Sequence, residues 1–148
     1  MDAPPHRSPN ASVVVALDSQ DHVAILSAPF PRHGGEYIFL PGGRQEQGET
    51  PEDCARRELR EEAGVTAQSW QHLASHAVTL GDSARVALFL ARRLTLGAQE
   101  LTETEQDFKL SWWPFKDALT AAATDGRFLL PGGPLALLLA EHSLSRFR

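Results

Sequence analysis

The chain has 148 residues, 42% of them hydrophobic and 22% charged, a composition typical of one globular domain with its own core. Its net charge of −5 argues against a nucleic-acid partner, because phosphate backbones are bound by clustered lysine and arginine side chains. A single cysteine, Cys54, excludes an internal disulfide and is typical of a cytoplasmic protein, and no apolar run is long enough to span a membrane.

The first part of the chain predicts a tail followed by three strands. Residues 1–11 are polar and proline-rich, so we expect a disordered tail before a single domain at residues 12–148. β-Branched or alternating runs predict strands at residues 12–17 and 22–28, joined as a hairpin by the polar turn between them. A third strand, at residues 36–40, leads into a glycine turn.

The second part predicts strands at residues 69–78, 83–91 and 108–113, with a polar, acidic loop at residues 94–107. Pro114 opens a helix that extends to about residue 123. The last helix, residues 134–143, is apolar almost all round and should therefore be well buried. This order of elements predicts an α+β fold with a sheet between helices.

A short helix lies between these two parts, and its ends are well marked. Thr50 is a good N-cap, Pro51 suits the first helical position, and Gly64 is a typical C-terminal stop, so we predict a helix at residues 51–63. One apolar stripe of this helix should face the core: Ala55, Leu59 and Ala63.

Two carboxylates beside this stripe have no basic neighbour on their own helix. Glu58 and Glu62 are four residues apart, so their like charges repel, whereas Glu61 can pair with Arg57. A solvated acidic face is the usual interpretation of such a run. Unpaired carboxylates at the edge of a buried stripe, however, need positive charge from elsewhere, and a divalent cation held by oxygen atoms is the natural candidate.

The residue order favours the cation, because it resembles the Nudix box with every fixed position filled. The box reads Gly43, five residues, Glu49, seven residues, then Arg57-Glu58-Leu59-x-Glu61-Glu62-x-Gly64-Val65. With average residue usage, such a match arises by chance on the order of once in 10⁹–10¹⁰ start sites. The resemblance implies an α/β/α sandwich around a mixed β-sheet and a hydrolase that cleaves pyrophosphate linkages with Mg²⁺, or with Mn²⁺ as a substitute.

The resemblance also implies a role for each matching residue. The implied metal ligands are the Gly42 carbonyl, Glu58, Glu61 and Glu62. Arg57 resembles the arginine that orients a glutamate through a salt bridge. The implied structural residues are Gly43, Glu49 and Gly64.

Hydrolysis also needs a general base that accepts a proton from the attacking water. In many Nudix enzymes this base comes from a loop beyond the box, and here Glu103 and Glu105 are the candidates in the acidic loop. A merely solvated acidic loop is the competing interpretation for both residues. Glu61 is an alternative base within the box.

The sequence predicts the substrate class less directly than it predicts the family. Residues 103–140 resemble the ADP-ribose and nucleoside diphosphate sugar branch, with an acidic loop, Trp112-Trp113-Pro114, a helix, an Asp-Gly-Arg triplet and a final apolar helix. We therefore expect hydrolysis of a nucleoside diphosphate derivative that resembles ADP-ribose. Two departures keep a nucleoside triphosphate pyrophosphohydrolase open: Gly42 stands where alanine is more common, and Leu80-Gly81 replaces a typical proline.

A third hypothesis is a catalytically silent, nucleotide-sensing Nudix domain. Such domains usually lose box glutamates, and this chain retains all of them. For any nucleotide substrate, Arg32 and Arg44 are candidate phosphate or ribose contacts. The candidates for stacking a base are Tyr37, Trp112 and Trp113. Solvated arginines and core aromatic residues are the competing interpretations, and a homodimer is left open.

Overall fold

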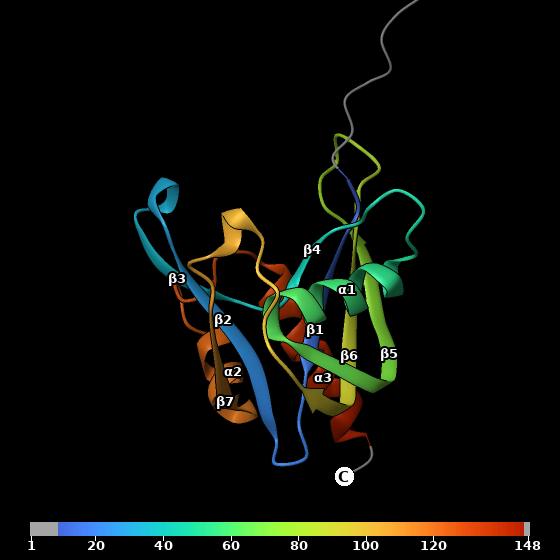
Figure 1. The fold of residues 1–148 in the computed structure, drawn as a ribbon, viewed down its shortest axis with the longest axis vertical. Coiled ribbons are helices and arrows are strands. Elements are labelled where there is room, and N and C mark those ends of the chain that lie inside the picture. Colours follow the sequence, from blue (N-terminus) through green and yellow to red (C-terminus); the bar gives the residue numbers. More distant parts are fainter. Residues whose placement is uncertain (1–8, 147–148) are drawn as a thin grey trace, which may run out of the picture.

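The computed structural model describes residues 9–146 of the chain (Figure 1). The strands are β1 (Ala11–Ala16), β2 (His22–Phe30), β3 (Gly35–Phe39), β4 (Gly42–Arg44), β5 (Val65–Ala77), β6 (Arg85–Leu96) and β7 (Lys109–Pro114). The α-helices are α1 (Pro51–Ala63), α2 (Phe115–Ala122) and α3 (Gly132–Ser145). Two short 3₁₀ turns, η1 (Pro31–His33) and η2 (Glu103–Glu105), complete the elements.

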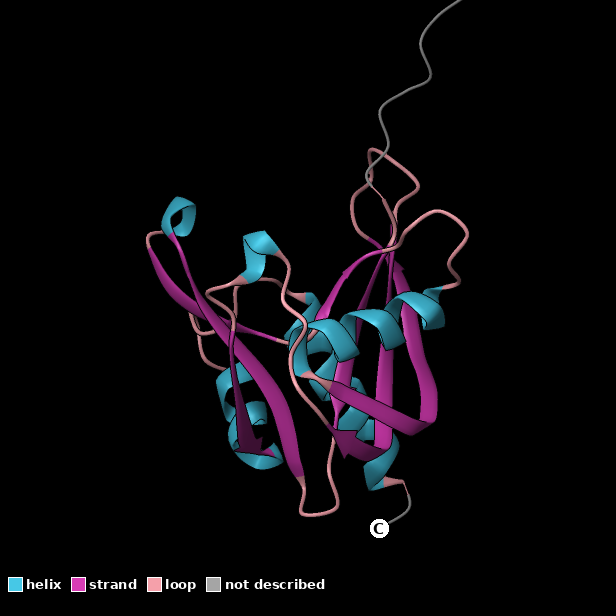
Figure 2. Cartoon of the chain, in the orientation of Figure 1, coloured by secondary structure: helices cyan, strands magenta, loops and turns pink. Residues whose placement is uncertain are grey.

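The strands form two sheets with orders β4-β1-β6-β5 and β3-β2-β7. Strands β1 and β6 run parallel and all other neighbours run antiparallel, so the larger sheet is mixed. Helix α1 lies on one side of the larger sheet and α3 lies on the other (Figures 1 and 2). The α+β sandwich with a mixed sheet is therefore confirmed.

The side chains of β1 point alternately to the two faces of the larger sheet, so this one strand contributes to two hydrophobic cores. Val14 packs in a cluster with Leu59 of α1, whereas Val15 packs in a second cluster with Leu137 of α3. All four side chains are fully buried, and each contributes about 1.5–3 kcal/mol by leaving water. Successive side chains of a strand point to opposite faces, so the central strand anchors both helical layers.

Helix α1 begins and ends as its sequence predicts. The Thr50 hydroxyl accepts a hydrogen bond from the Asp53 amide at 3.1 Å, and the Asp53 carboxylate accepts one from the Thr50 amide at 3.2 Å. This capping box satisfies two backbone donors of the first turn. Gly64 closes the helix in the left-handed region with φ of 69°.

The predicted hairpin between the first two strands is wrong. The turn exists, since the Asp18 amide donates to the His22 carbonyl at 2.9 Å, but only the isolated Leu17–Val23 bridge joins the two chain segments. Beyond it, β1 pairs with β4 and β6, and β2 pairs with β3 and β7. Each strand finds its partners far along the sequence, and alternation within a strand does not encode that choice.

Further predictions also differ from the structure. Residues 1–8 of the predicted tail lie outside the described residues, but Ala11 is the first residue of β1. Asn10 is also held, because its carbonyl accepts from the Gln45 amide at 2.7 Å and its side chain accepts from the Arg85 amide at 2.8 Å. The last helix is buried on one side only, since Leu138 is 55% exposed.

Replacing Gly64 with alanine should destabilise the fold. The residue has a positive φ, and a Cβ atom at this position would press on the backbone of Gly97 and Ala98. We expect the free energy of unfolding to fall by more than about 1–2 kcal/mol, the cost of the left-handed conformation alone. Urea unfolding of Gly64→Ala measures this loss.

Gly48→Ala is the matched control, because Gly48 has φ of 83° with no atom within 4 Å of the added carbon. It carries the conformational cost without the steric clash. Equal losses of stability in the two variants would contradict the proposed role of the close approach at Gly64.

Candidate functional site

Three carboxylates meet where α1 approaches η2. Glu58 and Glu62 of α1 and Glu105 of η2 each offer an oxygen atom, and these oxygens all lie within 4.8 Å of one another. Glu58 is 7% exposed and Glu62 is 3% exposed, while Glu105 is partly exposed. We call these three residues the acidic cluster.

The first two carboxylates are buried because of their position on α1. They flank the apolar stripe that packs on the sheet, so the packing of Leu59 carries Glu58 and Glu62 toward the interior. Burial raises the pKa of Glu58 to about 7 and the pKa of Glu62 to about 9, and the neighbouring carboxylates add to both shifts. Without a cation, these groups therefore retain protons that exposed glutamates lose.

Glu105 reaches the cluster because the loop before it is fastened to the end of α1. The Gly97 amide donates to the Gly64 carbonyl at 2.6 Å, and the Glu100 amide donates to the Glu61 carbonyl at 2.7 Å. The Gln99 side chain donates to the backbone carbonyl of residue 62 at 2.7 Å. These bonds satisfy carbonyls that a helix end leaves without partners.

Arg57 donates hydrogen bonds to three carboxylates on one side of the cluster. Its Nε and Nη2 atoms donate to the two oxygens of Glu49 at 2.7 and 3.0 Å. Its Nη1 atom donates to Glu58 at 2.8 Å and to Glu61 at 3.2 Å. The predicted Arg57–Glu61 pair is present, but Glu49 is the bidentate partner, and this hydrogen bonding lowers the pKa of Glu49.

Glycines of β4 let the backbone approach these carboxylates. A Cβ atom on Gly43 would lie 2.6 Å from the carboxylate of Glu58, so only glycine fits there without a shift. The Gly42 amide donates to Glu62 at 2.8 Å. The role implied for the Gly42 carbonyl, as a metal ligand, stays a prediction.

Other predicted residues are not members of the acidic cluster. Glu61 directs its carboxylate to Arg57, and Glu103 is exposed on η2; neither belongs to the three carboxylates that meet. Arg32 lies on η1, and the Tyr37 hydroxyl of β3 donates to the His33 carbonyl at 2.7 Å.

Arg44, at the end of β4, contributes its backbone carbonyl to Arg57 at 2.9 Å, and its own side chain is exposed. Gln99 and Glu100, which fasten the loop, were not predicted as parts of the site. No local sequence signal identifies them, because their role depends on where the loop lies in three dimensions.

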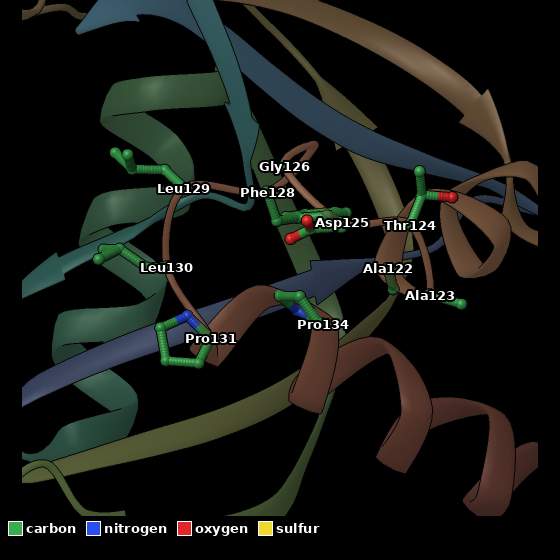
Figure 3. A pocket seen from close by; sticks show the side chains of 10 residues that line it. All are labelled: Ala122, Ala123, Thr124, Asp125, Gly126, Phe128, Leu129, Leu130, Pro131 and Pro134. Carbon is green, nitrogen blue, oxygen red and sulfur yellow. The ribbon is translucent and has the colours of Figure 1, made fainter. Parts of the chain in front are cut away.

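A hollow of about 390 Å³ lies away from the acidic cluster, between the end of α2 and the start of α3 (Figure 3). Its lining side chains are mostly apolar, with Thr124 and Asp125 as the polar ones. It contains no basic side chain and none of the box glutamates, so its residues do not suit a diphosphate and a metal ion.

Within residues 9–146, no helix combines the length and the apolar character that a membrane span requires.

Comparison with known proteins identifies the family. Residues 6–130 match the family model described as NUDIX domain. The chain is 32% identical over 111 residues to an ADP-ribose pyrophosphatase of Mycobacterium tuberculosis, which covers 73% of this chain and 54% of that protein.

It is also 31% identical over 136 residues to the NAD-capped RNA hydrolase NudC of Vibrio vulnificus, which covers 92% of this chain and 47% of that protein. The chain thus spans about half the length of these curated relatives.

Solved structures agree with the observed fold. A structure described as an ADP compounds hydrolase superposes with a TM-score of 0.78 at 20% identity, covering 95% of this chain and 76% of that chain. A MutT structure from work on Aliivibrio salmonicida and Vibrio cholerae gives a TM-score of 0.66 at 22% identity, covering 90% and 97%. The family model, the box and the shared fold together establish that this chain belongs to the Nudix family.

Proposed function

We propose that this Nudix domain hydrolyses the pyrophosphate linkage of a small nucleoside diphosphate derivative, similar to ADP-ribose, in a metal-dependent reaction. The acidic cluster is the observation that carries the proposal, because three carboxylates converge there, two of them buried. The names of an ADP-ribose pyrophosphatase relative and of an ADP compounds hydrolase with the same fold support this substrate class.

The donor set of the acidic cluster suits a hard divalent cation. Glu58 and Glu62 offer only oxygen atoms, which Mg²⁺ and Mn²⁺ prefer, and Glu62 is buried with no ion pair to a basic side chain among the described residues. When bound, such an ion polarises the phosphoryl oxygens and lowers the pKa of a coordinated water. We propose Mg²⁺ as the resident ion and Mn²⁺ as its substitute.

The side chains around the ion have separate tasks. Arg57 orients Glu58 through the 2.8 Å hydrogen bond and holds Glu61 beside it. Glu105 is the least buried member of the acidic cluster, so we leave metal binding to Glu58 and Glu62 and propose that Glu105 accepts the proton of an attacking water and passes it to solvent. We therefore prefer Glu105 to Glu103 and Glu61 as general base.

Arg32, Arg44 and Tyr37 stay predictions as substrate contacts, as do a homodimer and a cytoplasmic location. The predicted absence of a nucleic-acid partner also stays a prediction, and NAD-capped RNA belongs in the substrate panel because the NudC relatives are named for it.

A nucleoside triphosphate pyrophosphohydrolase is the second candidate. The name of a relative favours it, because 51 residues of the chain are 41% identical to an 8-oxo-dGTP diphosphatase of Proteus vulgaris, covering 34% of this chain and 46% of that protein. Product analysis separates the two functions: AMP with a sugar phosphate for the first, or a nucleoside monophosphate with pyrophosphate for the second. A panel of ADP-ribose, nucleoside triphosphates and NAD-capped RNA with Mg²⁺ and with Mn²⁺ decides between them.

We expect Glu62→Gln to abolish turnover while the fold is retained. The amide keeps the size of the side chain but removes one negative charge from the acidic cluster, and we expect kcat to fall by more than about 100-fold. Glu103→Gln is the matched control, because that side chain is exposed and outside the cluster. Near-normal kcat of Glu62→Gln at saturating Mg²⁺ would refute the assignment.

We expect Glu105→Ala and Glu103→Ala to differ sharply. Loss of a general base lowers kcat by about 10²–10⁴-fold, and Glu105 is the loop carboxylate that meets Glu58 and Glu62. We therefore expect that loss for Glu105→Ala and a change of less than about threefold for Glu103→Ala. Unchanged kcat in both variants would return the base to Glu61.

The metal-free protein should lose stability as the pH rises from about 5 to about 9. Burial raises the pKa of Glu58 to about 7 and of Glu62 to about 9, whereas an unfolded glutamate has a pKa of about 4.3. In this window the folded state binds more protons than the unfolded state, so the free energy of unfolding falls with pH.

Mg²⁺ should restore most stability at the alkaline end of this window, where the carboxylates are ionised. Urea unfolding at several pH values, with and without Mg²⁺, measures both effects. Glu62→Gln should flatten the pH dependence of the metal-free protein. A stability that rises with pH between 5 and 9 in the metal-free protein would exclude this account.

A further inference from the structure

Three phenylalanines, carried by β2, β3 and the segment after η2, form an aromatic group that we call the phenylalanine cluster: Phe30, Phe39 and Phe108. The ring centroids of Phe39 and Phe108 lie 4.9 Å apart, and those of Phe30 and Phe39 lie 5.5 Å apart, both in edge-to-face geometry. Phe39 is the central ring, and it joins the β2–β3 hairpin to the segment that follows η2.

These rings do not belong to either hydrophobic core. Among the described phenylalanines, Phe89, Phe115 and Phe128 pack within the two cores, whereas the phenylalanine cluster is absent from both and stays partly exposed. Ile38, beside Phe39 in β3, packs in the core of α2 and α3. Phe39 therefore projects from the opposite face of its sheet, the face on the side of α1.

A short segment of chain connects each of the two contacting rings to the acidic cluster, either to a member of the cluster or to the hydrogen-bond donor of one. Phe39 stands three residues before Gly42, whose amide binds Glu62. Phe108 stands three residues after Glu105, and its amide donates to the Glu105 carbonyl at 2.9 Å. Three residues span at most about 11 Å between Cα atoms, so each ring is carried by a segment that also bears Glu105 or the hydrogen-bond donor of Glu62. Figure 1 shows the turn that carries Glu105 between β3 and α1.

We propose that the phenylalanine cluster is the platform on which the nucleobase of the substrate stacks while the diphosphate lies at the acidic cluster. This inference rests on the proposed function, and it moves the base contact from Tyr37, Trp112 and Trp113 to Phe39 and Phe108. Phenylalanine rings offer a π face and no hydrogen-bonding group, which suits a planar base better than a sugar. The platform therefore accepts any nucleobase with little discrimination.

A purely structural role is the alternative: the Phe39–Phe108 contact would only hold the loop that carries Glu105. The two roles differ in what they predict for ligands with and without a base. A lost platform weakens only base-containing ligands, whereas a displaced Glu105 weakens metal-dependent binding of every diphosphate.

The test compares the binding of ADP and of inorganic pyrophosphate, both with Mg²⁺, by isothermal titration calorimetry. Loss of one stacking contact corresponds to about 5- to 150-fold in affinity. For Phe39→Leu and Phe108→Leu we expect the Kd of ADP to rise at least fivefold, while the Kd of pyrophosphate changes by less than twofold. Phe39→Tyr retains an aromatic face and should bind ADP like the original chain.

Three results would overturn the inference: an equal loss of affinity for both ligands, an unchanged Kd of ADP in both leucine variants, or no binding of ADP by the original chain. The measurement does not depend on turnover. A fivefold selective loss of ADP binding in a chain that hydrolyses no nucleotide would support the base platform and reject the proposed function, so the two failures are distinguishable.

Discussion

The burial of Glu58 and Glu62 against the larger sheet is the constraint on which the site depends. Helix α1 has to pack Leu59 on the sheet, and the two glutamates beside that stripe lose water with it. An ionised carboxylate without solvent or a partner is unstable, which is why the pKa of Glu62 rises to about 9. The hydrophobic packing of the helix therefore holds these carboxylates where positive charge is lacking, and a bound cation can supply that charge.

Positive charge is lacking on one side of α1 and present on the other, and this difference indicates the side on which a cation is needed. Arg57 supplies its charge to Glu49, Glu58 and Glu61, so one side of the helix is already compensated. On the other side, Glu62 accepts a hydrogen bond from the Gly42 amide, and no ion pair joins it to a basic side chain among residues 9–146. One neutral donor does not balance a full charge in a buried site. Glu62 and Glu105 therefore lie on the side of the acidic cluster where positive charge is lacking, and a cation held by this cluster would supply it.

Sequence patterns predicted the parts of this site that are local and missed the parts that are not. The bounds of α1, its capping box and its Arg57–Glu61 pair follow from spacing along one helix, and all are present. The choice between Glu103 and Glu105 could not be made, because it depends on how Gly97, Gln99 and Glu100 attach a loop to the end of α1. The wrong hairpin has the same origin, since strand pairing across two sheets is a long-range property.

The same two segments connect the chemistry to the recognition of substrate. Residues 39–42 and 105–108 each carry a phenylalanine at one end and a residue of the carboxylate site at the other. In the proposed arrangement, a ligand that contacts both ends is held by its base and by its diphosphate at once, through groups carried by β3, β4 and the η2 loop. Because stacking on phenylalanine barely distinguishes bases, the choice among diphosphate, triphosphate and capped substrates has to come from the surface beyond the diphosphate.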